Sequence, residues 1–200
     1  IPFVLFNRGQ RDRTLASVTS ANFAGGRLAA EFLIAGGHKR IAHIAGWQKS
    51  LNGQERQAGF LAGMAAARLV PFHVVDCHYR RVVAVEATRA LFAGAERPDA
   101  IFVGNDHMAF AVLETLRCEL GFDVPEDISV VGYDDVAMAA WRTFDLTTLR
   151  QPANRMAEAT VKALLSMIEQ NAPSPGRIEI DSPLVVRGSA RIPPGWSRTT

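Results

Sequence analysis

The side chains best suited to bind a ligand come directly after short apolar runs, which we expect to be strands. Carboxylates and amides bind hydroxyl groups, arginine binds hydroxyls or an anion, and aromatic rings cover the C–H face of a ring. This combination is typical of a cleft for a small polar molecule, sugar-like rather than lipid-like. The residues are Asn7, Arg8, Trp47, Asp76, Tyr79, Asn105, Asp106, Asp134 and Asp135, with Arg56 on the first turn of a following helix.

Each of these residues also has an ordinary structural role open to it. Asn105 can cap the helix that follows it, and Asp134 can belong to a turn after a strand. Arg56 can form a surface ion pair with Glu55, and Trp47 can pack at the rim of a cleft. A binding site is indicated by their convergence on one sheet edge, because ligands of open parallel sheets bind outside the carboxyl ends of the strands.

The elements that would position these residues alternate between strands and helices. Runs such as AIFV and ISVVG are too continuously apolar for a sheet with one wet face, so they indicate parallel strands covered on both sides. The alternation then predicts an α/β fold with a doubly wound parallel sheet. The expected strands are 2–6, 40–45, 72–76, 100–103 and 128–132, and the expected helices are 22–35, 53–68, 82–93 and 106–120.

The alternation breaks after residue 145. A loop, LTTLRQP, precedes a helix expected over 153–170, and two β-like runs follow at 177–180 and 184–187. The strand at 2–6 and this last helix fit a second sheet better than the first. Residues 191–200 are expected to form a flexible tail.

The sequence lacks the motifs of several enzyme classes. It contains no GxSxG nucleophile elbow, no GxxxxGK[ST] phosphate loop and no GxGxxG. The histidines form no HExxH pair, and we expect them at the surface. A Mg²⁺-dependent phosphoryl enzyme is one alternative, because Asp106, Asp134 and Asp135 follow strands, but no lysine follows a strand as that chemistry needs. We expect no enzymatic activity, no cofactor and no metal.

The overall composition is that of an ordinary globular protein. The 200 residues are 48% hydrophobic and 21% charged, with a net charge of +2. The basic residues are scattered, which argues against a nucleic-acid-binding surface. No apolar run approaches the ~18 residues of a membrane helix, and the first residues do not resemble a signal peptide. Two cysteines without CxxC spacing suit a reducing cytoplasm, and we expect no contact with a membrane.

Several motifs follow one another in a specific order along the chain. The most specific are VPEDISVVGYDD and LTTLRQP, accompanied by IPFVLFNR, ERQAGFLAGM and LVVRGS. In this respect the chain resembles the effector-binding core of the lac repressor (LacI/GalR) family of bacterial transcription regulators. The resemblance implies a periplasmic-binding-protein-like fold of two subdomains joined by three chain crossings. It assigns 1–20 and 147–176 to an incomplete N-terminal subdomain, and 21–146 and 177–190 to the C-terminal subdomain.

The same resemblance implies specific ligand contacts. In the family pattern, the effector-binding positions correspond to Asn7, Arg56, Asn105 and Asp134, and Trp141 lies in a loop expected to close over the cleft. Three positions depart from that pattern, namely Ala21 before the first helix, Trp47 in place of a proline, and Cys77 in place of an aromatic residue. Tyr79 is the candidate substitute for that missing ring.

The protein implied by the resemblance is a cytoplasmic, homodimeric regulator that senses a sugar-like effector. Effector binding would shift the cleft between open and closed forms. Operator DNA would be reached only through an N-terminal headpiece that this chain does not contain. The face with Phe110 and Leu113 and the segment 136–142 are the expected dimer interface, with core packing as the alternative. A periplasmic solute-binding protein of a transporter is the alternative function, and it would require a signal peptide.

Overall fold

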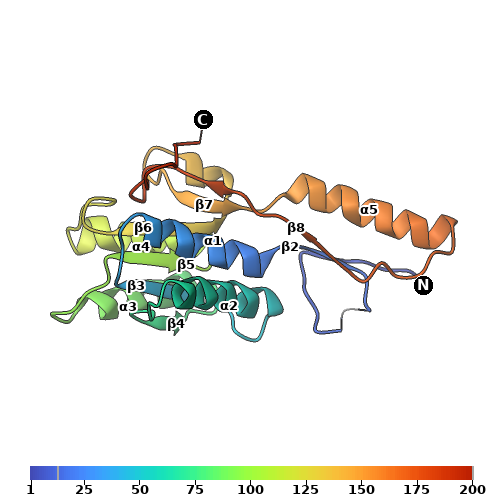
Figure 1. Cartoon of the computed structure of the whole chain (residues 1–200), viewed down its shortest axis with the longest axis horizontal. Coiled ribbons are helices and arrows are strands. Elements are labelled where there is room, and N and C mark those ends of the chain that lie inside the picture. Colours follow the sequence, from blue (N-terminus) through green and yellow to red (C-terminus); the bar gives the residue numbers. More distant parts are fainter. Residues whose placement is uncertain (13, 200) are drawn as a thin grey trace.

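Two β-sheets organise the chain in a computed structural model that describes residues 1–12 and 14–199 (Figure 1). One sheet has six strands in the order β4-β3-β5-β6-β7-β9, and the other has three in the order β1-β2-β8. Every strand pair is parallel except β7 with β9. The strands are β1 (Leu5–Phe6), β2 (Ser17–Ser20), β3 (Ile41–Ala45), β4 (Val74–Asp76), β5 (Ala100–Val103), β6 (Ser129–Asp134), β7 (Thr147–Arg150), β8 (Arg177–Ile180) and β9 (Leu184–Val185). The helices are α1 (Asn22–Ala35), α2 (Leu51–Ala66), α3 (Arg81–Phe92), α4 (Asp106–Glu114), which continues as a π-helix over Thr115–Glu119, and α5 (Ala153–Glu169).

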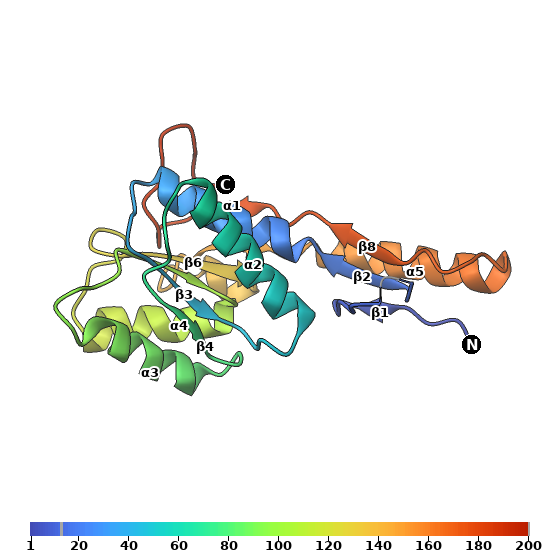
Figure 2. The same ribbon diagram turned by 60° about the horizontal axis from the view of Figure 1, so that its bottom comes forward.

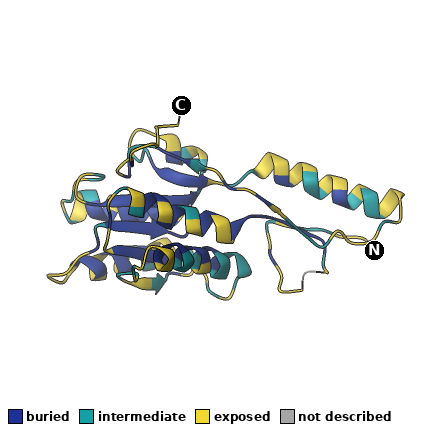
Figure 3. Cartoon of the chain, in the orientation of Figure 1, coloured by how far each residue is buried: buried dark blue, intermediate teal, exposed yellow. Residues whose placement is uncertain are grey.

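The six-stranded sheet is buried on both faces, which explains its continuously apolar strands (Figures 2 and 3). Ile41 and Phe102 point to one face and pack with α1 and α2. Ile44 and Ile101 point to the other face and pack with α3 and α4. The expected doubly wound parallel sheet is confirmed here.

The three-stranded sheet is the centre of a smaller unit. Its small core contains Val18, Met156 and Ile180, so α5 packs on β2 and β8. The opposite side of α5 is largely exposed, and the helix extends away from the rest of the molecule (Figures 1 and 3). The molecule thus consists of two subdomains of unequal size, the smaller built on β1-β2-β8 and the larger on the six-stranded sheet.

The chain passes between the two subdomains three times, from β2 to α1, from β7 to α5 and from β8 to β9. Two strands lie on the other side of the domain boundaries expected from the sequence. Residues 147–150 form β7 of the larger sheet because they pair with β6, and residues 177–180 form β8 of the smaller sheet because they pair with β2. The other expected boundaries stay a prediction.

Residues 191–199 are mostly exposed but contact the larger subdomain at several points, and the flexible tail expected there stays a prediction. The Trp196 ring meets Phe32 edge to face, with ring centroids 5.1 Å apart. The backbone N–H of Thr199 donates to the Val186 carbonyl, and the Val186 N–H donates to the Thr199 hydroxyl, both at 2.9 Å. Thr200, also assigned to the tail, lies outside the described residues.

His38 and His43 are buried, which corrects the surface positions expected for the histidines. His43 stacks on Phe102, and burial lowers the pKa of His43 to about 4. His38 contacts the Ser129 hydroxyl at 2.8 Å, and burial lowers the pKa of His38 as well. Among the described residues, no helix is long and apolar enough to cross a membrane.

Candidate functional site

A cavity of about 640 Å³ lies between the two subdomains. It is bounded by residues that follow β1 in the smaller sheet and β3 to β7 in the larger one, all at the carboxyl ends of parallel strands. Its volume falls within the ~300–1,000 Å³ that is usual for small-molecule sites. Seven of the candidate residues line it, namely Asn7, Arg8, Trp47, Arg56, Tyr79, Asn105 and Asp134, whereas Asp76, Asp106, Asp135 and Trp141 are not among its described lining residues.

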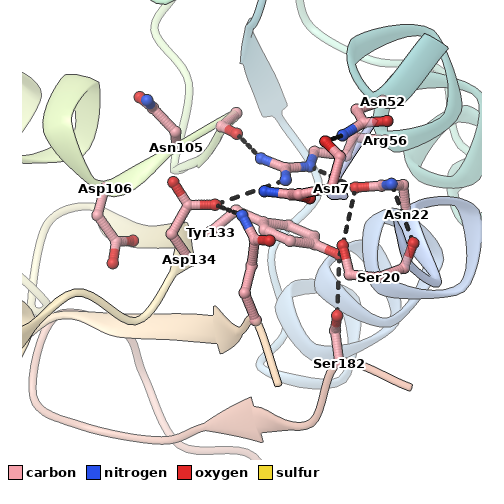
Figure 4. Close-up of polar contacts among 12 residues, drawn as sticks. Asn7, Ser20, Asn22, Asn52, Arg56, Asn105, Asp106, Tyr133, Asp134 and Ser182 are labelled. Atoms are coloured by element: carbon pink, nitrogen blue, oxygen red, sulfur yellow. Dashed lines mark hydrogen bonds and ion pairs between the residues drawn. The ribbon is translucent and has the colours of Figure 1, made fainter. Parts of the chain in front are cut away.

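The guanidinium of Arg56 is held from several sides and is only 4% exposed (Figure 4). Its Nε donates to Asn22 Oδ1 at 2.9 Å, and its Nη1 donates to the Gly104 carbonyl at 2.6 Å. Its Nη2 lies 3.5 Å from Asp134 Oδ1. The guanidinium carbon lies 3.6 Å from the centre of the Tyr133 ring, a cation–π contact. Arg56 is therefore a preorganised cation inside the site.

Close packing of α1 on α2 fixes the backbone that carries Arg56. A Cβ atom at Gly26 would collide with the Arg56 carbonyl, and one at Gly59 would collide with the Phe23 carbonyl. Glycine at these two positions lets the helices approach within backbone contact. The glycines of the segments ANFAGGR and ERQAGF thus allow the close helix packing that fixes the position of Arg56.

Asp134, the last residue of β6, and Asp135, which follows it, have left-handed backbone conformations with φ of 124° and 57°. Such conformations are uncommon for residues other than glycine and concentrate at functional sites. The Asp134 carboxylate accepts a hydrogen bond from Gln151 Nε2 at 2.5 Å and faces the cavity. Asp135 points away from it, because its carboxylate accepts hydrogen bonds from Arg150 and Arg187. The two neighbours therefore have different roles.

Asn105 and Asp106 divide in the same way at the start of α4. Asn105 caps the helix by accepting from the Met108 N–H at 3.0 Å, which confirms the capping role. It also lines the cavity, and its contact with a ligand stays a prediction. Asp106 is fully buried and accepts from the Thr148 hydroxyl at 2.6 Å and from the Val136 N–H at 3.0 Å. Burial raises the pKa of Asp106 to about 7. Asp106 therefore supports the loop after β6 from within the core.

The acidic residues do not assemble into a metal site. The Asp106 carboxylate is occupied by two hydrogen-bond donors, and the Asp135 carboxylate is occupied by two arginines. Within residues 1–12 and 14–199, no group of three His, Cys, Asp or Glu side chains is arranged to hold a metal ion. The geometry thus gives no support to the phosphoryl-enzyme alternative.

Asn7 brings the smaller subdomain to the cavity. It has a left-handed backbone, φ 51°, and its Oδ1 atom is buried without a hydrogen-bond partner among the described residues. Asn52 on α2 holds this loop in place, because its Nδ2 donates to the Asn7 carbonyl at 3.0 Å and its Oδ1 accepts from the Gly9 N–H at 3.1 Å. An unpaired buried acceptor is costly, so the Asn7 side chain is well suited to accept a hydrogen bond from a ligand.

Trp47 and Tyr79 form the aromatic part of the wall. Tyr79 packs directly on Gly46, where a Cβ atom would collide with the ring. Burial raises the pKa of Tyr79, so its hydroxyl is neutral and able to donate at neutral pH. Two aromatic residues beside several amides and carboxylates suit the faces and hydroxyls of a sugar ring.

Trp141 is one of the candidates that the structure does not place at the cavity. It follows a short 3-10 helix, Ala137–Ala140, whose Ala139 packs in the core, and the Trp141 side chain is 56% exposed. It is not among the described residues that line the cavity.

The expected interface residues Phe110 and Leu113 are also corrected, because both are buried in the core of the larger subdomain.

Several residues of the site are not predicted from the sequence. Gln151 and Asn52 line the cavity, whereas Asn22 and Tyr133 hold Arg56 from behind. The position of Gln151 is one that sequence reasoning can find, because Gln151 directly follows a strand, β7, as Asn105 directly follows the region of β5. The run TTLR is too polar to be recognised as a buried strand, so the sequence does not predict that Gln151 lies at the end of one.

A buried polar cluster joins the site to two of the chain crossings (Figure 4). The Tyr133 hydroxyl donates to the Ser182 hydroxyl at 3.1 Å and lies 3.5 Å from the Ser20 hydroxyl. The Ser20 hydroxyl in turn donates to Asn22 Oδ1 at 3.2 Å. Ser20 ends β2 and Ser182 lies between β8 and β9, so the hydroxyl of the ring beneath Arg56 contacts two of the three connections between the subdomains.

An ion pair also ties the subdomains together. Glu55 on α2 accepts two hydrogen bonds from Arg177 on β8, both at 2.5 Å, and the Arg177 guanidinium is almost fully buried. These hydrogen bonds raise the pKa of Arg177. Glu55 therefore pairs across the cleft with Arg177, whereas Arg56 pairs with Asp134, which excludes the simple Glu55–Arg56 surface pair.

We expect Glu55→Gln to lower the free energy of unfolding by about 2 kcal/mol, because a charge-assisted bidentate pair is lost while Arg177 stays buried. Glu179, 3.0 Å from Arg177, keeps part of the charge compensated. Urea unfolding measures this effect, and Glu114→Gln, which removes an exposed pair with Arg81, is the matched control with an expected loss below about 0.5 kcal/mol. Equal losses in both variants would contradict the account.

Comparisons with known proteins agree with the fold. The model of the periplasmic binding protein-like domain matches residues 30–190. The ribose operon repressor of Escherichia coli (strain K12) is 34% identical over 193 residues, which cover 95% of this chain and 58% of the repressor. The chain thus spans just under three fifths of the length of this relative. It is named as a repressor, not as an enzyme.

Two solved structures extend the comparison. A complex of the transcriptional regulator CelR with cellobiose has a TM-score of 0.87 and 34% identity, covering 95% of this chain and 59% of that one. A lac repressor dimer bound to operator and an anti-inducer has a TM-score of 0.86 and 27% identity, covering 95% and 65%. The chain therefore belongs to the LacI family of transcriptional regulators and corresponds to their periplasmic-binding-protein-like, effector-binding domain.

Proposed function

We propose that the cavity binds a small polar effector, a sugar or a polyol, and that the protein is the sensing core of a cytoplasmic, homodimeric transcription regulator. The observation that carries this proposal is that both subdomains form the wall of one polar cavity. Asn7 and Arg8 come from the smaller subdomain, and Arg56, Asn105 and Asp134 come from the larger one. A ligand in this position contacts both.

The proposed mechanism follows from that geometry. A ligand that bridges the subdomains binds the closed arrangement more tightly than an open one, so it shifts the population towards the closed form. Arg56 donates hydrogen bonds to ligand hydroxyls, and Asp134 accepts hydrogen bonds from them. Asn7 adds an acceptor from the opposite wall. A shift from 1:99 to 99:1 requires about 5.5 kcal/mol of differential binding.

The relatives support the proposed partners. One relative is in complex with cellobiose, and another is a dimer bound to operator. The exposed part of the segment 136–142, with Trp141, remains available for contact with a second copy of the chain. We propose that operator DNA is contacted by a headpiece outside this chain, and that subdomain closure changes the spacing of two such headpieces.

A ligand panel tests the proposal. Sugars, polyols and nucleobases are added to the protein one at a time, and the Tm is measured. We expect at least one of them to raise the Tm. At a concentration of 100 times its Kd, such a ligand raises the free energy of unfolding by about 2.7 kcal/mol. Asp134→Asn should weaken that ligand at least tenfold, whereas Glu96→Gln, the same change on the distant surface, should not. A panel without any binder, or an effect of Glu96→Gln equal to that of Asp134→Asn, would contradict the assignment.

A further inference from the structure

The wall of the cavity carries more positive than negative charge. Among the described residues that line it, four have a cationic side chain and two have a carboxylate. The cations are Arg8, Arg11, Lys49 and Arg56, and the carboxylates are Asp12 and Asp134. Like charges gathered around a partly enclosed cavity repel one another, so such an excess is best compensated by an anion inside it.

The carboxylates of the wall already have partners. Asp134 is shared between Arg56 and Gln151, and Asp12 accepts from the N–H and the hydroxyl of Thr14. In the described part of the chain, none of the ion pairs involves Arg8, Arg11 or Lys49. Three cationic side chains at the cavity are therefore available to an incoming group.

These cations come from both sides of the cleft. Arg8 and Arg11 belong to the loop after β1 in the smaller subdomain, and Lys49 belongs to the loop between β3 and α2 in the larger one. The hydrogen bond from the Gly9 N–H to Asn52 Oδ1 fastens the first loop to the start of α2, three residues after Lys49. The three side chains thus line the same cavity from both subdomains.

The backbone adds to the positive potential there. Helices α2 and α4 both begin at the cavity, since Ser50 and Asn105, their capping residues, line it. A helix N-terminus carries about half a positive charge, which favours an anion nearby. The first turn of α2 contains no acidic residue that would cancel this contribution.

The rest of the wall requires more than a simple inorganic anion. The buried Asn7 Oδ1 has no hydrogen-bond partner among the described residues and needs a donor such as a hydroxyl. The amides of Gln54 and Gln151 also line the cavity, and Trp47 and Tyr79 offer aromatic faces. A ligand with hydroxyls, a ring with C–H faces and a negative group would match all of these features.

We propose that the effector is an anionic carbohydrate, with a carboxylate or phosphate held by Arg8, Arg11 and Lys49 and a ring held by the polar and aromatic wall. This inference rests on the proposed function and makes it more specific. An anion that contacts the loop after β1 and the loop before α2 together also favours subdomain closure, because its charge is compensated fully only when both loops are close.

Sets of ligands that differ only in charge test the proposal by isothermal titration calorimetry. Suitable sets are glucose, glucuronate and glucose 6-phosphate; galactose and galacturonate; and ribose and ribose 5-phosphate. We expect at least one acidic member to bind at least 100-fold more tightly than its neutral parent. Comparison of the uronates with the phosphates identifies the anionic group, and its affinity should fall as salt is raised.

Lys49→Gln should weaken the acidic ligand about tenfold and reduce the salt dependence of its binding, with little effect on Tm. Lys39→Gln is the matched control, because Lys39 is exposed at the amino end of β3, the opposite end of that strand from the cavity. If the tightest ligand is neutral, or if Lys49→Gln and Lys39→Gln change the affinity for the acidic ligand equally, the proposal of an anionic effector is overturned while the proposed function stands. If no member of any set binds, both are overturned.

Discussion

Arg56→Ala is expected to lower the free energy of unfolding by about 3 kcal/mol, because the substitution removes a buried cation that satisfies several groups at once. The Gly104 carbonyl and Asn22 Oδ1 lose their charged donor, and Asp134 loses its cationic neighbour. The cation–π contact with Tyr133 is lost as well. Urea unfolding measures the stability, and calorimetry with the ligand found in the panel should show at least a 100-fold loss of affinity.

Two further variants separate the possible causes of such a loss. Arg56→Lys keeps the charge but cannot reproduce the fork of donors, so it should fold well and still bind ligand at least tenfold more weakly. Arg27→Ala removes an exposed arginine of α1 that pairs with Glu31 and should cost less than about 0.5 kcal/mol. If Arg56→Ala were as mild as Arg27→Ala, the central position of Arg56 would be wrong.

Asp106 should make the protein less stable as the pH rises from about 4 to about 7. Burial, with Asp134 and Asp135 nearby, raises the pKa of the folded-state carboxyl to about 7 from its ordinary value of 3.8. The folded state therefore holds this proton over a range in which the unfolded state has lost it, and the stability falls with pH. A shift of this size corresponds to roughly 4 kcal/mol between pH 4 and pH 8.

The histidines act in the opposite direction, so the wild-type profile alone is not diagnostic. Burial lowers the pKa of His43 to about 4, and the pKa of His38 is lowered too, so these groups raise the stability as the pH increases through the same range. Urea unfolding of wild type and Asp106→Asn between pH 4 and pH 8 isolates the aspartate. Relative to wild type, Asp106→Asn should gain several kcal/mol in free energy of unfolding as the pH rises from 4 to 8. Parallel profiles of the two proteins would refute the prediction.

The sequence predicts the core of the larger subdomain well because its strands carry their own signal. The strands β3 and β5 are continuously apolar, as expected for strands covered by helices on both faces. By contrast, β2 and β7 read SVTS and TTLR, and the buried hydroxyl groups of β7 find partners far away in the sequence. Thr148, for example, donates to Asp106, 42 residues away. Such pairings cannot be recognised from local hydropathy.

The candidate site was predicted to the extent that its residues follow recognisable strands. Asn105 and Asp134 come directly after apolar runs, and the edge of the sheet brings them together. Gln151 was missed because its strand was missed, and Asn52 because it lies within α2. Trp141 does not line the cavity, since the 3-10 helix after β6 anchors Ala139 in the core and leaves Trp141 exposed, so its contact with a ligand stays a prediction.

A crystal structure of the protein with the ligand selected by the panel tests the central claim most directly. We expect the ligand between the subdomains, with Arg56 and Asp134 on one side and Asn7 on the other. The Asn7 Oδ1 atom should then accept a hydrogen bond from the ligand. A ligand that contacts only one subdomain, or that lies outside the cavity, would contradict the account of the protein as a sensor that closes around its effector.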